Sequence, residues 1–274
     1  MSALTKQENA EEENTARPGK RVSHYLLAYV TWTVNAIAIS LIFGFQSLYP
    51  QDIAIFSNVV APIAAGVSFV AALFCVRKYG FGFGRFNRVW VLFALGTAFS
   101  MVAESIWTIY NYVLNVAIPY PSAADIFYIA AYVPLFAGFV AYLQMFSRAM
   151  TKTRLAVAAV AIALSAIVVL TVVVPIEFSK SQAAALNFTD ALYPILDLSL
   201  LSVALLCLVI FINGKLGKWW LLICGGAIFN IAGDELFLYQ TSQSTYYNGS
   251  ASDLLFIVGY LFFALAFYVH RKEL

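Results

Sequence analysis

Acidic side chains without basic partners are the residues of this chain best suited to chemistry. Seven of them lie within or at the edges of apolar segments, with no Lys or Arg placed to neutralise them: Glu104, Asp125, Asp190, Asp197, Asp234, Glu235 and Asp253. Placing an ionisable group in the apolar interior of a bilayer costs at least about 3 kcal/mol. Residues kept at that cost mark binding sites, proton relays or transport pathways, so these carboxyls are the first candidates for function.

The segments that carry these acids are long and apolar enough to cross a membrane. Of the 274 residues, 62% are hydrophobic and only 11% are charged, whereas about a quarter of the residues of a soluble domain are charged. Apolar runs of about 20 residues predict membrane-spanning helices. We therefore predict an all-α polytopic membrane protein with eight transmembrane helices, near residues 25–48, 53–76, 89–115, 123–147, 155–176, 187–213, 218–241 and 251–270.

Basic residues indicate how these helices are oriented. Of the 16 Lys and Arg residues, only Lys180 falls on one side of the predicted bundle, and all the others fall in the termini and loops of the opposite side. Basic loops face the cytoplasm. We therefore predict a multi-pass protein of the cell membrane with both termini in the cytoplasm, in which residues 1–23 form a disordered cytoplasmic tail. The net charge of +2 gives no reason to expect a nucleic-acid partner.

The chain also contains two similar halves. Three segments of the first half align without gaps on the second, at offsets of 132, 130 and 128 residues: 56–76 on 188–208, 90–107 on 220–237 and 122–132 on 250–260. The matches include distinctive residue types in the same order: Pro62 with Pro194, Cys75 with Cys207, Trp90 with Trp220, Glu104 with Asp234, and Asp125 with Asp253. We predict two parallel four-helix repeats, 24–147 and 148–274, related by a twofold axis along the membrane normal.

Helical geometry places three of the acids in the outer half of the bilayer. At 1.5 Å per residue, Glu104 lies roughly 22 Å from the inner end of its helix, at the same depth as Asp234, and Asp197 lies roughly 15 Å below the outer end of its own helix. We predict that these three acids line one outward-facing acidic pocket and bind its ligand, together with Asn230, Trp107 and Tyr193. Because bare carboxylates repel one another in a low dielectric, at least one should be protonated at neutral pH.

A simpler interpretation of the same acids stays open. Neutral carboxyls can form hydrogen bonds between helices and stabilise the bundle without binding any ligand. Asp234 and Glu235 are adjacent and cannot both face the same way, so we assign the inward position to Asp234, which has the repeat partner.

Two further acids precede apolar helices in a pattern typical of helix caps. The pattern of a capping box occurs twice, in Ser122-Ala-Ala-Asp125 and Ser250-Ala-Ser-Asp253. In such a box the Ser side chain accepts a hydrogen bond from an N–H of the first turn, and the acid side chain accepts one from the Ser backbone N–H. We predict that Ser122 and Ser250 cap their helices, with Asp125 and Asp253 as the returning acids.

The histidines and lysines argue against a metal or a covalent cofactor. Only His24 and His270 are present, and both lie at predicted cytoplasmic edges, so a buried histidine-rich metal site is not expected. The last helix (251–270) contains no Lys that could form a retinal Schiff base. We predict no metal and no cofactor, although carboxylates alone could hold a hard cation.

The stretch from Glu104 to Tyr132 resembles a known family. In it an acid near the end of one helix is followed by the run Pro119-Tyr120-Pro121-Ser122-Ala123-Ala124-Asp125-Ile126-Phe127-Tyr128 that opens the next helix. This pattern is similar to the membrane-embedded input region of bacterial GGDEF/EAL signalling proteins. The resemblance implies a sensor that acts on a cytoplasmic signalling partner. Since the sequence ends at Leu274, just past the last helix, we expect a stand-alone relative.

A second resemblance implies a different activity. Gly233-Asp234-Glu235-Leu236 is similar to a Gly-Asp pair in the lysoplasmalogenase family of eight-helix membrane hydrolases. This resemblance implies an intramembrane lipid hydrolase that uses Glu104, Asp197 and Asp234. The sequence thus favours a membrane sensing module for a small molecule, a cation or a lipid, with such a hydrolase and a proton- or cation-coupled carrier as alternatives.

Overall fold

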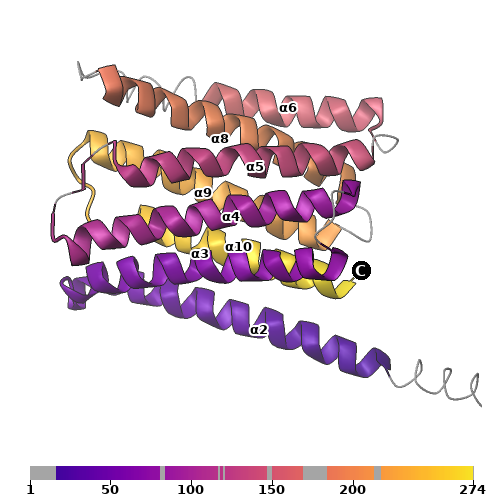
Figure 1. Cartoon of the computed structure of the whole chain (residues 1–274), viewed down its shortest axis with the longest axis horizontal. Coiled ribbons are helices and arrows are strands. Elements are labelled where there is room, and N and C mark those ends of the chain that lie inside the picture. Colours follow the sequence, from indigo (N-terminus) through magenta and orange to yellow (C-terminus); the bar gives the residue numbers. More distant parts are fainter. Residues whose placement is uncertain are drawn as a thin grey trace, which may run out of the picture.

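The computed structural model describes residues 17–80, 84–116, 118–119, 121–146, 150–168, 184–212 and 217–273. Within these ranges the chain is helical and contains no strand. The long helices run side by side in one bundle (Figure 1). They are α2 (Arg17–Gly44), α3 (Asp52–Tyr79), α4 (Arg85–Thr108), α5 (Ala123–Met145), α6 (Lys152–Val168), α8 (Ala184–Phe211), α9 (Gly217–Ser242) and α10 (Ala251–Glu273).

Each predicted apolar segment overlaps one of these helices, and the described part is all-α, as expected of a helical membrane protein. Seven helices of the described part are long and apolar enough to span a membrane. The exception is α6, of which 17 residues are described, and the rest of the predicted segment 155–176 lies outside the described residues. The predicted tail 1–23 is wrong at its C-terminal end, because α2 already begins at Arg17; residues 1–16 lie outside the described part.

Six helices form a closed ring, and two lie outside it. Around the ring, α3 packs on α4, α4 on α5, α5 on α8, α8 on α9, α9 on α10, and α10 on α3. Of the two helices outside the ring, α2 packs on α10 and α6 packs on α8. They lie on opposite flanks of the bundle (Figure 1). The ring is therefore the part of the fold that can enclose a site.

Two glycines let neighbouring ring helices approach closely. A Cβ on Gly96 of α4 would lie 2.5 Å from Leu135 Cγ and 3.3 Å from the Ala131 carbonyl oxygen of α5. On α9, a Cβ on Gly226 would lie 2.8 Å from Phe263 and 3.0 Å from the Gly259 carbonyl oxygen of α10. Neither position has room for a side chain, so each crossing depends on a residue without a Cβ.

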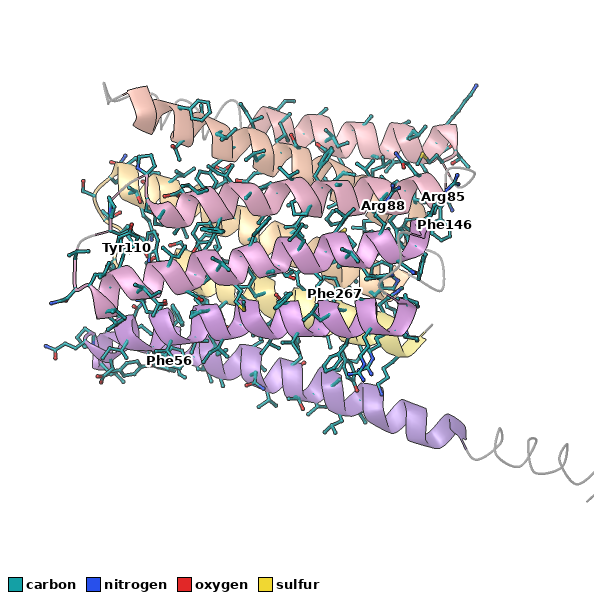
Figure 2. All side chains as sticks on the ribbon, viewed as in Figure 1. Phe56, Arg85, Arg88, Tyr110, Phe146 and Phe267 are labelled. Atoms are coloured by element: carbon teal, nitrogen blue, oxygen red, sulfur yellow. The ribbon has the colours of Figure 1, made fainter. Side chains whose placement is uncertain are left out.

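One end of the bundle is filled by a layer of aromatic side chains. Trp90, Trp219, Trp220 and His270 have no exposed surface. His270 stacks on Trp90 at 4.0 Å between ring centroids, and Trp219 lies 4.4 Å from both His270 and Trp220. We call these four residues the aromatic layer. It lies at the end where α10 finishes and where Arg85 and Arg88 of α4 project (Figure 2).

Both ends of the described chain lie at this same end of the bundle. The N-terminal end of α2 and the C-terminal end of α10 point the same way (Figure 1). Tyr110, near the end of α4, lies at the opposite end (Figure 2). There α4 continues into a turn of π-helix, Ile109–Val113, and the segment between Ser242 and Ala251 joins α9 to α10.

Candidate functional site

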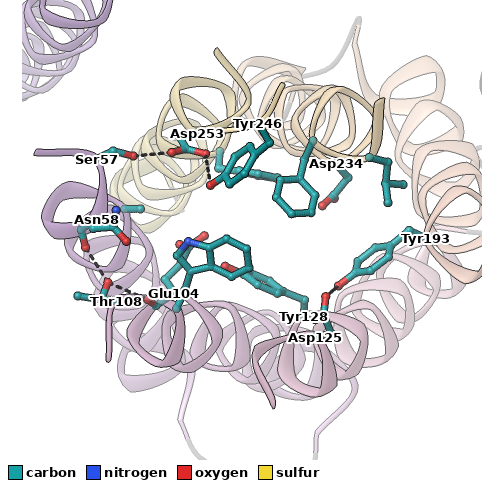
Figure 3. A pocket seen from close by; sticks show the side chains of 15 residues that line it. Ser57, Asn58, Glu104, Thr108, Asp125, Tyr128, Tyr193, Asp234, Tyr246 and Asp253 are labelled. Atoms are coloured by element: carbon teal, nitrogen blue, oxygen red, sulfur yellow. Dashed lines mark hydrogen bonds between the residues drawn. The ribbon is translucent and has the colours of Figure 1, made fainter. Parts of the chain in front are cut away.

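A cavity opens inside the helix ring, toward the end opposite to the aromatic layer. It encloses about 630 Å³ of empty space, part of which is open to the surroundings. All six ring helices contribute side chains (Figure 3). The lining residues are Ser57, Asn58, Ala61, Glu104, Trp107, Thr108, Asp125, Tyr128, Tyr193, Asp234, Phe237, Leu238, Tyr246, Asp253 and Phe256.

Four carboxyls surround this cavity, and no Lys, Arg or His of the described residues lines it. Asp253 and Glu104 lie on one side, and Asp234 and Asp125 lie on the other (Figure 3). Glu104, Asp125 and Asp253 are almost fully buried, with exposed fractions of 5%, 5% and 8%. Among the described residues, the cavity wall thus contains four acids and no base.

The deeper two carboxyls are each held by a tyrosine from a neighbouring helix. Tyr260 of α10 donates to Glu104 Oε1 at 2.9 Å, and Tyr132 of α5 donates to Asp234 Oδ2 at 2.9 Å. Tyr260 follows Asp253 by seven residues and Tyr132 follows Asp125 by seven, so each tyrosine shares a helix face with a cavity acid. The spacing of seven residues from an acid is visible in the sequence and indicates both tyrosines, although neither is among the predicted site residues.

Asp125 has the predicted capping role and a second contact. The Ser122 backbone N–H and hydroxyl donate to Asp125 Oδ2 at 2.6 and 2.8 Å, and the Ala124 N–H donates to Ser122 Oγ, which completes a capping box. On the other oxygen, Tyr193 of α8 donates to Oδ1 at 2.8 Å. A residue predicted only as a cap is therefore also part of the cavity wall, as is the predicted ligand residue Tyr193.

Asp253 differs from its predicted capping box. Its Oδ2 accepts from the Gly249 N–H at 2.7 Å and from the Ser57 hydroxyl of α3 at 2.8 Å, and its Oδ1 accepts from Tyr246 at 3.2 Å. The Ser250 hydroxyl donates to Gln240 Oε1 instead of capping the helix. The loop before α10 can offer the Gly249 N–H because this glycine has a φ of 94°. The bonds join α3 to α10, which sequence spacing could not indicate.

Tyr246 belongs to the loop between α9 and α10 and lines the cavity. Burial raises the pKa of its hydroxyl well above the ordinary value, and the neighbouring Asp253 carboxyl raises it further. The phenol therefore keeps its proton and acts as a hydrogen-bond donor to Asp253.

The remaining predicted site residues lie in three different places. Trp107 lines the cavity and donates through Nε1 to Asn248 Oδ1 at 3.2 Å. Asn230 lines a second cavity of about 490 Å³, which shares Asp234, Tyr128 and Phe256 with the first. Asp197 is fully buried but is not among the residues that line either cavity.

Asp197 nevertheless belongs to the same hydrogen-bond network. Tyr132 Oη lies 2.5 Å from Asp197 Oδ1 and 2.9 Å from Asp234 Oδ2, so one hydroxyl joins the two carboxyls. The prediction that Glu104, Asp197 and Asp234 all line one pocket thus needs correction. Glu104 and Asp234 line the pocket. Asp197 does not line it, but it is hydrogen-bonded to Tyr132, which also bonds Asp234. The side chain of Asp190 lies outside the described part of the chain.

Glu235 does not face the cavity. Both of its carboxyl oxygens are buried and have no hydrogen-bond partner within the described residues, and the residue lines neither cavity. Asp234, its neighbour, does line the cavity, in agreement with the assignment of Asp234 as the inward acid.

Most lining residues occupy matching positions of the two aligned halves. At the offsets of 132, 130 and 128 residues, twelve of the fifteen form pairs: Ala61 with Tyr193, Glu104 with Asp234, Trp107 with Phe237, Thr108 with Leu238, Asp125 with Asp253, and Tyr128 with Phe256. The two tyrosine–carboxylate bonds match at the same offsets, and so do the two glycine crossings with their partners.

Comparison with known proteins identified no relative of this chain. No family model matches the chain, and neither a curated protein nor a solved structure is significantly similar to it.

Proposed function

We propose that this protein is a membrane sensing module that binds a small organic cation in the acidic cavity of the helix ring. The observation that carries the proposal is a cavity lined by four carboxyls and six aromatic residues, with no basic side chain among them.

Charge is the first reason to propose a cation. Asp125 and Asp253 each accept three hydrogen bonds at 3.2 Å or less, which hold their carboxyl oxygens in fixed positions at the cavity wall. An anionic site shielded from water attracts cations strongly, because its carboxylates interact with little dielectric screening. A cationic ligand would supply the counter-charge that no described lining residue provides.

Aromatic side chains are the reason to propose an organic cation. Trp107, Phe237 and Tyr246 contact one another edge to face, with ring centroids 4.7 to 6.2 Å apart, at one side of the cavity. Aromatic faces bind ammonium groups and also cover alkyl chains. Within the described residues, no group of three His, Cys, Asp or Glu side chains is arranged to hold a metal ion. The wall chemistry thus fits an amine better than an inorganic ion.

A carrier is the second candidate, and the second cavity is the observation that favours it. This cavity shares the lining residues Asp234, Tyr128 and Phe256 with the first, so a carrier would pass its cation from the first cavity to the second at these side chains. Transport would also require a path through the aromatic layer, whose four residues have no exposed surface. A binding and sensing role needs no such opening. The hydrolase alternative lacks the expected three-carboxyl site, because Asp197 does not line the cavity.

We also propose that the chain consists of two parallel four-helix repeats, with the cavity on the twofold axis between them. The proposal is supported by the paired lining residues, the paired tyrosine–carboxylate bonds and the paired glycine crossings. Sites of repeated membrane folds commonly lie where the repeats meet. An experimental structure with Glu104 and Asp234 at clearly different depths would contradict this arrangement.

The charge asymmetry supports a further proposal, that the cavity opens to the outside of the cell membrane. The end with the aromatic layer carries Arg85 and Arg88 and would face the cytoplasm, together with both termini and a signalling partner. In intact cells, a membrane-impermeant maleimide should label Gln243→Cys, in the exposed loop beside the cavity, and leave Ser2→Cys unlabelled. Labelling of Ser2→Cys from outside would reverse the orientation.

Cation binding can be measured directly on the purified protein in lipid nanodiscs. Butylammonium should raise the thermal unfolding temperature, since a ligand that binds only the folded state adds about 2.7 kcal/mol of stability at 100 times its Kd. Butanesulfonate, which has the opposite charge, should not. The double variant Glu104→Gln/Asp234→Asn should show a smaller stabilisation by butylammonium, because two of the four cavity acids are then neutral.

The controls separate specific binding from general salt effects. Sodium chloride at equal ionic strength sets the baseline, and Glu235→Gln removes an acid next to Asp234 that does not line the cavity. Equal stabilisation of the wild type and the double variant by butylammonium would refute the proposed function.

A further inference from the structure

We infer that the ligand of this cavity is a linear α,ω-diamine, whose two ammonium groups bind the two opposite pairs of carboxyls. The inference rests on the proposed function, that the cavity binds organic cations, and it specifies their class. It follows from the arrangement of the acids and from the character of the wall between them.

The four acids form two pairs on opposite sides of the cavity, which we call the two poles (Figure 3). Glu104 and Asp253 make one pole, with contributions from α4 and α10, and Asp234 and Asp125 make the other, from α9 and α5. A single ammonium group can contact one pole and leaves the other without a counter-charge.

Within each pole the two carboxyls have different hydrogen bonds. Asp253 and Asp125 each receive three hydrogen bonds from the protein, which fix their positions. Asp234 receives a single bond, from Tyr132, and Glu104 receives one from Tyr260, with Tyr128 also close to it. Glu104 and Asp234 therefore keep more acceptor capacity for a ligand. Each pole thus combines one fixed carboxylate with one that can accept bonds from an ammonium group.

The two poles are also equivalent in sequence. Glu104 matches Asp234 and Asp253 matches Asp125 at the offsets that relate the two halves of the chain. A site with twofold-related charges is complementary to a ligand whose charges are related in the same way. An α,ω-diamine has this property, because its two ends are identical.

The wall between the poles is apolar. Phe237 and Phe256 line the cavity and carry no polar side-chain atom, and Leu238 and Ala61 add aliphatic surface. A methylene chain can be covered by such side chains, whereas a sugar or a peptide would leave hydroxyls or amides without partners. The inferred ligand thus has charge at its ends and hydrocarbon in its centre.

The experiment compares diamines with monoamines of equal chain length on the intact protein in nanodiscs. Binding is followed by isothermal titration calorimetry with diaminoalkanes of three to eight carbons and the matching alkylamines. A second ammonium–carboxylate contact should make the best diamine bind about 10- to 100-fold more tightly than its monoamine. Glu104→Gln and Asp234→Asn should each reduce that advantage to less than about threefold, and Glu235→Gln should retain it.

The possible results distinguish this inference from the proposed function. If diamines and monoamines bind equally and both depend on Glu104 and Asp234, the diamine inference is wrong and the cation site stands. If no amine binds the folded wild-type protein, both are wrong. A diamine advantage that survives Glu104→Gln and Asp234→Asn would also overturn the inference, because the second contact would then lie elsewhere. Thermal unfolding of every variant identifies those that fail to fold.

Discussion

Replacing Tyr132 with Phe should lower the free energy of unfolding by about 2–4 kcal/mol, through the loss of one oxygen atom. The Tyr132 hydroxyl is the contact between Asp197 Oδ1 and Asp234 Oδ2, at 2.5 and 2.9 Å. Without it, two carboxyls in the interior of the bundle lose a hydrogen-bond partner that the apolar surroundings cannot replace. The measurement is unfolding in mixed micelles by a denaturing detergent.

The geometry explains why this contact should matter more than an ordinary hydrogen bond. A hydroxyl has one proton to donate, yet the Tyr132 oxygen lies within hydrogen-bonding distance of two carboxyl oxygens. One of the two bonds therefore needs a proton that belongs to a carboxyl. A proton shared among Asp197, Tyr132 and Asp234 would reduce the repulsion between the two acids, and Tyr132→Phe removes its central member.

Two other tyrosines provide matched controls. Tyr142 is on the same helix and is fully buried, but its hydroxyl has no hydrogen-bond partner within the described residues. Tyr142→Phe should therefore change stability by less than about 0.5 kcal/mol. Tyr260→Phe removes a single bond, to Glu104, and should have an intermediate effect. If Tyr132→Phe is as stable as Tyr142→Phe, the shared-hydroxyl network contributes nothing to the fold.

The sequence was most informative about the helices and about depth. Apolar runs predicted where the helices of the described part occur, because a bilayer requires about 20 apolar residues per helix. The alignment of the two halves and depth counting paired Glu104 with Asp234, and both line the cavity. Helix positions and depths follow from counting residues along single helices.

Contacts between helices are what the sequence could not supply. Asp197 has a suitable depth, but the structure places Tyr132 between it and Asp234. Asp253 was interpreted as a cap because local spacing fits a cap, whereas its carboxyl also binds Ser57, 196 residues away in sequence. The rotation of each helix about its own axis decides such contacts. In an all-apolar segment little in the sequence pattern fixes that rotation.

Two tyrosines in the middle of apolar segments, Tyr132 and Tyr260, form a sequence pattern that indicates polar contacts. A tyrosine in the middle of an apolar span needs a partner for its hydroxyl, and Tyr132 and Tyr260 are such residues at matching positions. Each lies seven residues after an acid and so faces the same interior. The pattern predicts polar contacts for both, although it does not say with which helix.

Replacing Trp90 with Ala should cause the largest loss of stability, about 3–5 kcal/mol. Trp90 has no exposed surface, and its ring lies between 4.0 and 6.4 Å, centroid to centroid, from those of His270, Trp219 and Phe267, among others. Truncation would leave a cavity lined by rings that belong to different helices and cannot collapse together. Trp220→Ala, at the matching position of the second half, should have an effect of similar size.

Trp107 is the control that separates packing from binding. Its ring lines the acidic cavity and is only partly buried, so Trp107→Ala should cost much less stability than Trp90→Ala. It should instead weaken amine binding by about fivefold or more, because a cation–aromatic contact contributes about 1 kcal/mol or more when shielded from water. The opposite pattern, with unchanged amine binding in Trp107→Ala and weakened binding in a folded Trp90→Ala protein, would place the ligand beside the aromatic layer and contradict a site among the four carboxyls.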